Sequence, residues 1–263
     1  MLITRVLSAA VLIPVVLGTA YAGGPYFAVI VTVAALLAGY EFYCIMRERG
    51  HEPSYVAGLA LIAVLLIDAY APRSGIMRCG VTATVIVLML SQILRADTQG
   101  FLTNWALTLV GALYVGGLAG HLVSVRNLPG GLGWLMLTFA GTWATDTAAY
   151  FAGTYHGRRG FFTRLSPHKT LEGAVAGFVL GIVAILIAGH LLGLLLWQSL
   201  VLGVLLTLGV TFGDLAESLV KRQVGVKDSS TLIPGHGGML DRIDSLLFAG
   251  VVVYYFAIWV VGV

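Results

Sequence analysis

Long apolar stretches that carry almost no charge follow one another along the whole chain, and they constrain the fold more than any other feature. The longest, from Leu171 to Phe212, contains only Glu172 as a charged residue. Of the 263 residues, 59% are hydrophobic and 10% are charged, whereas soluble domains average about 25% charged residues. So few charges cannot cover a water-exposed surface, which excludes a soluble enzyme, a disordered protein and a nucleic-acid-binding protein. The sequence predicts an all-α, polytopic integral membrane protein.

Hydropathy divides the chain into about nine candidate transmembrane helices of about 20 residues each. They are Arg5–Ala22, Pro25–Cys44, Tyr55–Tyr70, Met77–Leu94, Ala106–Val125, Leu132–Tyr155, Leu171–His190, Trp197–Val220 and Leu240–Val263. The stretch beyond Leu171 is too long for one helix, so we divide it near Gly189–Leu196, where Gly193 favours a turn. We interpret the first segment as a transmembrane helix and not as a cleaved signal peptide.

The distribution of basic residues predicts the orientation of these helices. With a cytoplasmic N-terminus, 12 of the 15 Lys and Arg residues fall on the cytoplasmic side. Only Arg73, Arg78 and Arg126 fall on the other side. This asymmetry favours a cytoplasmic N-terminus, an external C-terminus and an odd number of spans.

Acidic residues and lysines divide the chain into two parts. The first 130 residues contain five acids, namely Glu41, Glu48, Glu52, Asp68 and Asp97. Most of these lie at predicted helix ends, where we expect a solvated role. The other seven acids and all three lysines follow residue 130. We therefore predict N-terminal scaffold helices over 1–130 and C-terminal catalytic helices with cytoplasmic loops over 131–263, within one membrane domain.

Five of the later carboxylates are predicted to gather in the cytoplasmic half of the membrane: Asp146, Asp214, Glu217, Asp241 and Asp244. An ionisable group at that depth costs several kcal/mol unless it is paired, hydrated or metal-bound. Asp214 and Glu217 share one helix face, and Asp241 and Asp244 share another. Carboxylates on two facing helices can hold Mg2+, which prefers oxygen ligands. The alternative is a set of salt bridges with Lys221, Arg222 and Arg242.

Two loops next to these acids have the composition of a phosphate-binding site. Residues 221–238 are basic and rich in hydroxyls, and they end in glycines around His236 just before a helix. Glycine-flanked N–H groups and a helix N-terminus attract anions, although a solvated loop that follows the positive-inside rule is the alternative. In the second loop, Ser166 before Pro167 is typical of a helix start. Capping of that helix is the alternative role for Ser166.

Glycines also recur at a spacing of four, as in Gly173, Gly177 and Gly181. On a helix they share one face and allow a neighbouring helix to approach closely.

The loop motifs resemble those of the phosphatidate cytidylyltransferase (CDP-diacylglycerol synthase) family. The resemblance rests on Ser218–Arg222, Lys227-Asp228 and Pro234–Asp244, supported by Asp146–Tyr150, Ser166–Gly173 and Gly213–Ser218. It covers about residues 140–245. His168 stands where we expect a basic residue, usually Lys, so this position lacks a permanent positive charge.

The resemblance implies that CTP and phosphatidate react to give CDP-diacylglycerol and pyrophosphate, with Mg2+ required and the number of metal ions left open. It also implies a homodimer in the inner (plasma) membrane, with the active site facing the cytoplasm. We assign metal binding to Asp214 and Asp241, supported by Asp146 and Asp244. The predicted catalytic residues are Lys169, Lys221, Arg222, Lys227, Asp228, His236 and Arg242. The predicted substrate-binding residues are Ser166, Lys169, Thr170, Glu172, Ser218, Gly235, Gly237 and Gly238.

Two other functions stay open on sequence grounds. A CTP-dependent transferase acting on another lipid phosphate or alcohol would share these loops, because the sequence reveals little of the pocket for the lipid tail. A cation-coupled transporter would also carry intramembrane acids. Transporters, however, typically show inverted repeats and charges near the midplane, whereas the charges of this chain concentrate toward one face in the C-terminal half.

Overall fold

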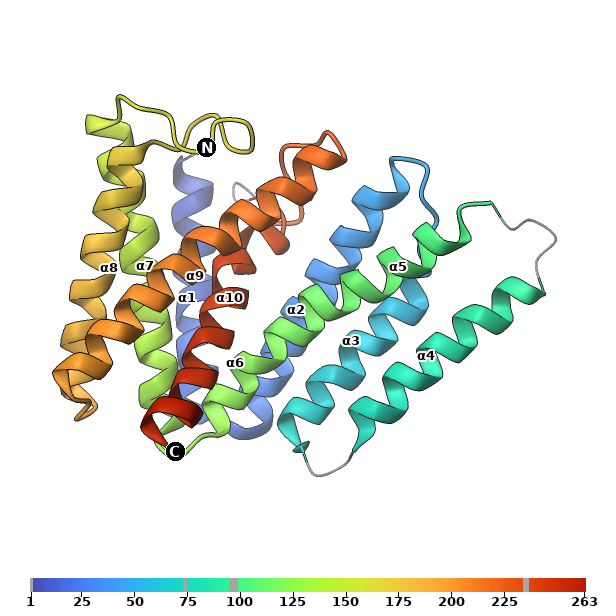
Figure 1. The fold of residues 1–263 in the computed structure, drawn as a ribbon, viewed down its shortest axis with the longest axis horizontal. Helices are drawn as coiled ribbons and strands as arrows, with labels where there is room; N and C mark the ends of the chain where they lie inside the picture. Colours follow the sequence, from blue (N-terminus) through green and yellow to red (C-terminus); the bar gives the residue numbers. More distant parts are fainter. Residues whose placement is uncertain (1, 73–74, 95–98, 234–236) are drawn as a thin grey trace. The chain divides into compact units, whose positions relative to one another are not determined.

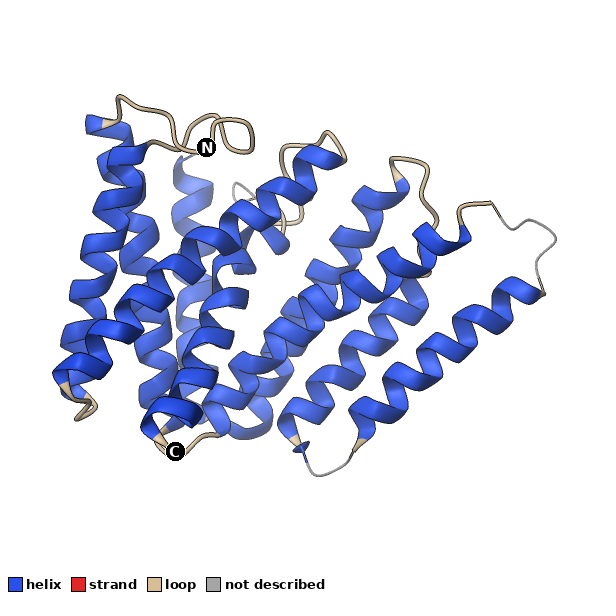
Figure 2. Cartoon of the chain, viewed as in Figure 1, coloured by secondary structure: helices blue, strands red, loops and turns tan. Residues whose placement is uncertain are grey.

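The computed structural model describes residues 2–72, 75–94, 99–233 and 237–263, which fold into helices joined by short loops (Figures 1 and 2). The helices are α1 (Leu2–Ala22), α2 (Gly24–Arg47), α3 (Tyr55–Tyr70), α4 (Ile76–Ile93), α5 (Phe101–Ala112), α6 (Leu118–Asn127), α7 (Gly131–His156), α8 (Leu171–Leu191), α9 (Leu196–Gln223) and α10 (Leu240–Phe256). The π-helical turns Leu113–Gly117 and Ala257–Val261 join α5 to α6 and extend α10. Each of the nine predicted segments is helical, which confirms the all-α class.

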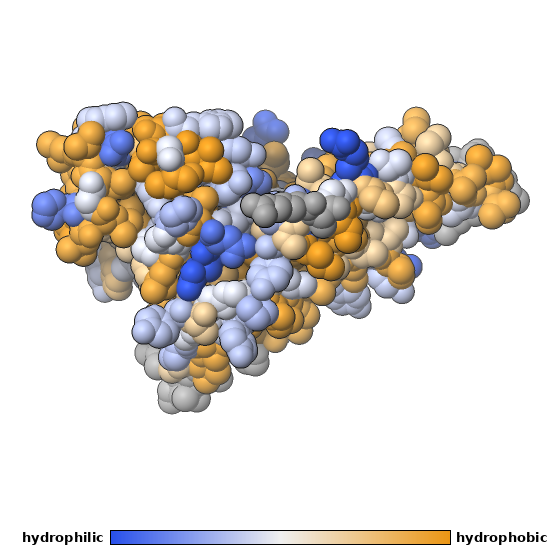
Figure 3. Space-filling view, turned by 90° about the horizontal axis from the view of Figure 1, so that it is seen from below, coloured by the Kyte–Doolittle hydropathy of each residue, from blue (hydrophilic) through white to orange (hydrophobic). Residues whose placement is uncertain are grey.

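Six of the helical segments are long and apolar enough to cross a membrane. They are Gly24–Arg47, Ile76–Ile93, Phe101–Asn127, Leu171–Leu191, Leu196–Gln223 and Leu240–Val261. Shorter apolar helices cover Ala10–Ala22 and Tyr55–Tyr70. On the face shown in Figure 3, groups of hydrophobic residues lie among hydrophilic ones. Many large hydrophobic side chains are exposed along the helices, for example Val29 and Leu102, and extensive exposed apolar surface is typical of a protein that lies in a membrane.

The break between α8 and α9 lies within the predicted interval. Gly193 has a positive φ of 75°, and the Leu194 N–H donates to the Gly189 carbonyl at 2.9 Å. Glycine adopts this left-handed conformation without steric cost, which makes it the usual residue just after a helix end. At the next helix, the Gln198 side chain accepts from the Leu195 N–H at 2.9 Å and satisfies a free donor of the first turn.

The expected helix start at Ser166 is wrong, because α8 begins five residues later in the chain. Thr170 is the N-cap, and its hydroxyl accepts from the Gly173 N–H at 3.2 Å. Residues 161–168 form bends and turns, and two backbone bonds close this loop: the Phe161 N–H donates to the Lys169 carbonyl at 2.8 Å, and the Leu171 N–H donates to the Arg159 carbonyl at 2.8 Å. These bonds between two segments of the chain use the Lys169 carbonyl and the Leu171 N–H, which a helix starting at Ser166 would need for its own hydrogen bonds.

The chain divides into two compact units. Unit 1 comprises residues Met1–Ser124 and Val224–Arg242, and unit 2 comprises residues Val125–Gln223 and Ile243–Val263. The loop before α10 therefore groups with the N-terminal helices, although it lies within the predicted C-terminal half of the sequence.

In unit 1, α3 packs against α2, α4 and α5. The buried ring of Tyr43 joins α2 to α5, because its hydroxyl donates to the Thr108 carbonyl at 2.7 Å. This bond satisfies a polar atom that would otherwise be costly to bury. It also holds the second half of α2 in a fixed position within the unit.

In unit 2, α7, α8 and α9 pack against one another, with the closest approach between α7 and α8. A Cβ atom at Gly173 would lie 2.7 Å from the Ala149 carbonyl oxygen, and one at Gly177 would lie 2.8 Å from the Thr145 carbonyl oxygen. Gly181 continues the same stripe against the Thr145 side chain. The predicted close approach at these glycines is therefore confirmed, and it places α7, with Asp146, beside α8.

Candidate active site

Asp214 on α9 is the centre of a polar cluster in unit 2. The Lys169 ammonium lies 2.7 Å from Asp214 Oδ2, and both side chains are partly exposed. On the other carboxylate oxygen, Asp214 Oδ1, the Ser218 hydroxyl donates at 3.4 Å from one turn further along the helix. Thus a predicted phosphate-binding lysine and a predicted metal-binding carboxylate form an ion pair with each other.

Asp244 belongs to the same cluster and is buried at 9% exposure. Its Oδ1 accepts from the Ser245 N–H at 2.7 Å. The carboxylate also interacts electrostatically with Asp214, Asp146 and Lys221. Asp244 is thus close enough to both Asp214 and Asp146 to be repelled by them.

The approach of α10 to α9 depends on a glycine. A Cβ at Gly213 would lie 2.8 Å from the Asp244 carbonyl oxygen. A larger residue at this position would push the two helices apart. The small residue before Asp214 therefore allows the carboxylates on α9 and α10 to share one site.

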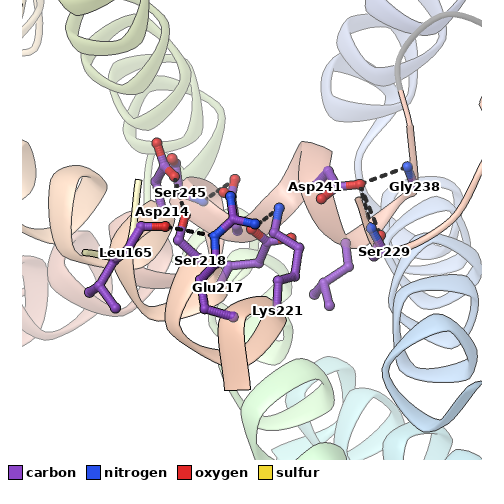
Figure 4. A network of polar contacts seen from close by, with 12 residues as sticks. Leu165, Asp214, Glu217, Ser218, Lys221, Ser229, Gly238, Asp241 and Ser245 are labelled. Carbon is purple, nitrogen blue, oxygen red and sulfur yellow. Dashed lines mark hydrogen bonds and ion pairs between the residues drawn. The ribbon is translucent and has the colours of Figure 1, made fainter. Parts of the chain in front are cut away.

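The next turns of α9 carry paired basic residues. The Lys221 Nζ lies 2.5 Å from Glu217 Oε2, and the Glu217 side chain is 1% exposed (Figure 4). Arg222 donates through Nε to the Leu165 carbonyl at 3.0 Å, which ties α9 to the loop between α7 and α8. Both predicted catalytic cations are therefore held in defined positions, Lys221 by Glu217 and Arg222 by Leu165.

In the loop between α7 and α8, the predicted substrate-binding residues have partners within the protein. Glu172 Oε2 accepts from the Arg158 and Arg159 N–H groups at 3.1 and 3.2 Å. Thr170 caps α8, as described above. Ser166 is half-buried and His168 is exposed at the turn that leads to Lys169. These contacts fix the conformation of the loop that places the Lys169 ammonium next to Asp214.

Asp241 lies in unit 1, at the start of α10. Its Oδ2 accepts from the Ser229 N–H at 3.1 Å, from the Ser229 hydroxyl at 3.0 Å and from the Gly238 N–H at 2.8 Å (Figure 4). Gly237, four residues earlier, has a φ of 83°, and its carbonyl accepts from the Ile233 N–H at 2.9 Å. The loop therefore folds back onto the carboxylate that follows it.

Glu41 on α2 is a residue that sequence reasoning missed. We expected a solvated role for it, and that expectation is wrong, because the residue is only 3% exposed. Its carboxylate binds Ser229, Ser230, Met239 and Leu240. The available signal was its place within an apolar stretch, since an ionisable residue inside a predicted span is a functional candidate.

The remaining predicted residues lie in the loop before α10 or at the start of that helix. Lys227, Asp228 and Arg242 are exposed, so the two cationic side chains, Lys227 and Arg242, are open to anions from solvent. Gly235 and His236 lie outside the described residues.

The carboxylates of unit 2 suit a hard divalent cation that also binds a substrate. Mg2+ is usually held by one or two protein carboxylates together with waters and substrate phosphates. Asp214 and Asp244 supply such oxygens, and a cation would relieve the repulsion of Asp244 by Asp214 and Asp146. Within the described part of the chain, no group of three or more His, Cys, Asp or Glu side chains is arranged to hold a metal by itself. The donor set therefore fits a metal shared with phosphate oxygens.

Comparison with known proteins shows similarity over almost the whole chain. Residues 3–260 match the model of the cytidylyltransferase family. The chain is 32% identical to a phosphatidate cytidylyltransferase of Synechocystis sp., over 97% of this chain and 96% of that protein. It is 34% identical to a phosphatidate cytidylyltransferase of Brucella suis, over 96% of this chain and 92% of that protein.

A plant relative is similar to the same degree. The chain is 34% identical to the chloroplastic phosphatidate cytidylyltransferase 5 of Arabidopsis thaliana, over 91% of this chain and 67% of that protein. Because the family match extends from the first helix to the last, it includes unit 1 as well as the polar cluster of unit 2. The chain belongs to the cytidylyltransferase family.

Proposed function

We propose that this protein transfers the cytidylyl group of CTP to phosphatidate and releases pyrophosphate. A phosphate oxygen of phosphatidate attacks the α-phosphorus of CTP and forms the new P–O bond. The bond between that phosphorus and the oxygen bridging to the β-phosphate breaks, and pyrophosphate leaves with its electron pair. The products are CDP-diacylglycerol and pyrophosphate.

The observation that carries this proposal is the similarity to phosphatidate cytidylyltransferases over at least 96% of the chain in the two bacterial comparisons. The polar cluster around Asp214 supports it, because the cluster combines carboxylates with cations inside a protein that is otherwise apolar. The nucleophile of this reaction is the phosphate of the lipid, which is already anionic at neutral pH. The site therefore needs no protein nucleophile, and its task is to position two anions and neutralise their charge.

The basic residues supply that neutralisation in our proposal. Lys169, Lys221 and Arg222 are held around Asp214 and Glu217. Fixed cations aimed at developing charge stabilise a transition state without further reorganisation. The Lys169 ammonium becomes available to a phosphate when its pair with Asp214 opens. Lys227 and Arg242 remain predicted catalytic residues, and both are exposed.

We assign Mg2+ binding to Asp214 and Asp244 with support from Asp146, and we keep Asp241 as a further predicted ligand. When bound, the metal would neutralise phosphate charge and stabilise the leaving pyrophosphate. The protein's own part is to hold the carboxylates: Gly213 sets the approach of α9 to α10, and Ser218 donates to Asp214.

We also propose that the site faces the cytoplasm of a bacterial inner membrane and that the protein is a homodimer. The excess of Lys and Arg on one predicted side supports the orientation. Cytosolic CTP would then reach the site directly, and the lipid would enter from the bilayer between helices.

The direct test is to purify the protein in detergent and supply labelled CTP, Mg2+ and phosphatidate. We expect labelled CDP-diacylglycerol and pyrophosphate in equal amounts. Replacing phosphatidate by an isoprenoid phosphate or an archaeal ether lipid phosphate tests the alternative acceptors. Absence of any lipid product, together with cation-dependent uptake into proteoliposomes, would refute the proposal in favour of a transporter.

Asp241→Asn tests the predicted role of the carboxylate at the start of α10. The substitution keeps the size of the side chain and removes its charge, so we expect CTP- and Mg2+-dependent turnover to be abolished while expression and dimerisation persist. Product formation from labelled CTP measures the first outcome and size-exclusion chromatography the second. Full activity of this variant would remove Asp241 from the metal assignment.

A further inference from the structure

We propose that Glu41 is a positioning residue for the proposed cytidylyl transfer: it holds the loop before α10 in the shape that fixes the Asp241 carboxylate. This inference rests on the proposed function for its catalytic consequence and on the geometry of unit 1 for its structural part. It assigns a role to an N-terminal helix that the sequence marks only as scaffold.

The Glu41 carboxylate is fully occupied by donors from the loop and from α10. Oε1 accepts from the Ser230 hydroxyl at 2.6 Å and from the Met239 N–H at 2.8 Å. Oε2 accepts from the Ser229 hydroxyl at 3.0 Å and from the Leu240 N–H at 2.8 Å. An ionised carboxylate offers about four acceptor sites in total. Four donors thus lie within hydrogen-bond distance of this side chain, all from one segment far away in the sequence, and the single Ser229 hydroxyl proton is shared with Asp241.

These bonds explain what the N-terminus of α10 binds. Free N–H groups in the first turn of a helix attract negative charge. We expected this helix start to bind a substrate phosphate, but the Met239 and Leu240 N–H groups donate to Glu41, and the Gly238 N–H donates to Asp241. Glu41 thus caps α10 from another helix.

Gly238 shows how close the approach is. A Cβ atom at this position would lie 2.5 Å from Glu41 Oε2 and would also collide with the Ser229 hydroxyl. Only glycine leaves room for the carboxylate against the loop. The glycine in this motif is therefore explained by an internal acid.

The same contacts connect Glu41 to Asp241. Ser229 Oγ lies 3.0 Å from Glu41 Oε2 and 3.0 Å from Asp241 Oδ2. Glu41 also holds Met239 and Leu240, the two residues directly before Asp241. Both sides of the loop around Asp241 are therefore bound to one buried side chain, and loss of that side chain would release them together.

A second contact ties the start of this loop to the end of α2. The Arg49 guanidinium donates through Nε to the Val224 carbonyl. A Cβ atom at Gly225, which has a φ of 68°, would collide with the same guanidinium. Residues 41–49 therefore bind the loop at its beginning and at its end.

Glu41→Gln is the central test. Glutamine has nearly the same size, but it replaces one acceptor oxygen by an NH2 group, which cannot accept a hydrogen bond from the backbone N–H donors that Glu41 binds. We expect kcat to fall by about 10- to 100-fold, the range typical for residues that orient a metal ligand. The KM for phosphatidate should stay unchanged, and the Mg2+ concentration at half-maximal rate should rise. Glu48→Gln is the matched control, since Glu48 lies seven residues further on and is exposed.

A spin label measures the position of the loop without reference to activity. Leu232 is 51% exposed, and its N–H donates to the Ser230 hydroxyl at 3.1 Å. After replacement of the free cysteines Cys44 and Cys79 by Ser, a nitroxide on Leu232→Cys reports loop motion. We expect Glu41→Gln to increase the mobility of this label and Glu48→Gln to leave it unchanged.

Ser230→Ala tests the same contact if Glu41→Gln does not accumulate in the membrane. It removes one of the donors to Glu41, so a smaller loss of kcat and a smaller gain of label mobility are expected. In the double variant with Glu41→Gln, the loss should not exceed that of Glu41→Gln alone, because both changes break the same contact.

The two readouts separate the inference from the proposed function. If the wild-type protein makes no CDP-diacylglycerol, the proposed function fails, and the spin label still shows whether Glu41 orders the loop. If the wild-type protein is active, the inference is overturned when Glu41→Gln keeps the wild-type kcat and Mg2+ response. It is also overturned when activity falls without any change in the label's mobility.

Discussion

At the scale of single residues, the polar cluster of unit 2 holds its charges in pairs. Lys169 binds Asp214 and Lys221 binds Glu217, while Asp244 interacts with two other acids and with Lys221. In a poorly solvated site, an unpaired charge is costly, so each of these two lysines lies beside a carboxylate that neutralises it. The same ion pairs hold the two lysine ammonium groups next to the position where we propose that phosphates bind.

Lys169→Met tests whether the Lys169 ammonium contributes to catalysis. Methionine keeps much of the length of the side chain but cannot neutralise a phosphate. We expect kcat to fall by about 100- to 1000-fold, as is usual when one stabilising group is removed from a transition state. The measurement is the rate of CDP-diacylglycerol formation in detergent. Arg78→Gln, at an exposed position on α4, is the control, and equal rates for both variants would contradict a catalytic role for Lys169.

At the scale of elements, helix–helix contacts place the site. The glycine stripe of α8 lets α7 approach until backbone oxygens of α7 fill the space where Cβ atoms would lie. Close approach of this kind is a main source of helix association in lipid, where burial of apolar surface gives no advantage. It matters for the site because α7 carries Asp146 and α8 begins directly after Lys169.

Gly177→Val tests the contact between α7 and α8. The added side chain would meet the Thr145 carbonyl oxygen, and overpacking of this kind typically costs about 1–3 kcal/mol. We expect a lower midpoint of thermal unfolding in detergent. Val179→Leu is the matched control, because Val179 is 51% exposed on the same helix and has room for a larger side chain. An unchanged midpoint for Gly177→Val would show that the helices can separate without cost.

At the scale of the whole molecule, the compact units do not follow the order of the sequence. Residues 224–242 group with the N-terminal helices, and residues 243–263 group with α7, α8 and α9. The N-terminal helices therefore contribute directly to the segment that carries Asp241. This grouping gives a structural reason why the family match covers residues 3–260 as a whole.

The predicted orientation can be tested by labelling cysteines from each side of the membrane. In a cysteine-free background, an impermeant thiol reagent added to intact cells should label Leu195→Cys, in the turn between α8 and α9. It should label Leu232→Cys only after permeabilisation. Both positions are exposed in the structure. The cysteine-free parent is the control, and the reverse labelling pattern would overturn the cytoplasmic placement of the N-terminus.

The sequence alone determined the helical class, the helix boundaries to within a few residues and the residues of the polar loops. These properties depend on local hydropathy and on motif spacing, which every short window of the chain contains. The turn at Gly193 and the stripe at Gly177 were predictable for the same reason, because each needs only its own backbone conformation or face.

Only the tertiary structure decided which of these residues meet. Glu41 and Glu48 look alike in sequence, but one is buried against Ser229 and the other is exposed. The difference depends on which face of α2 packs against a loop nearly 190 residues away, and no local pattern records such a contact. For the same reason, α8 starts at Leu171 and not at the predicted Ser166. Backbone bonds to residues 159–161 outweighed the local preference for a cap at Ser166.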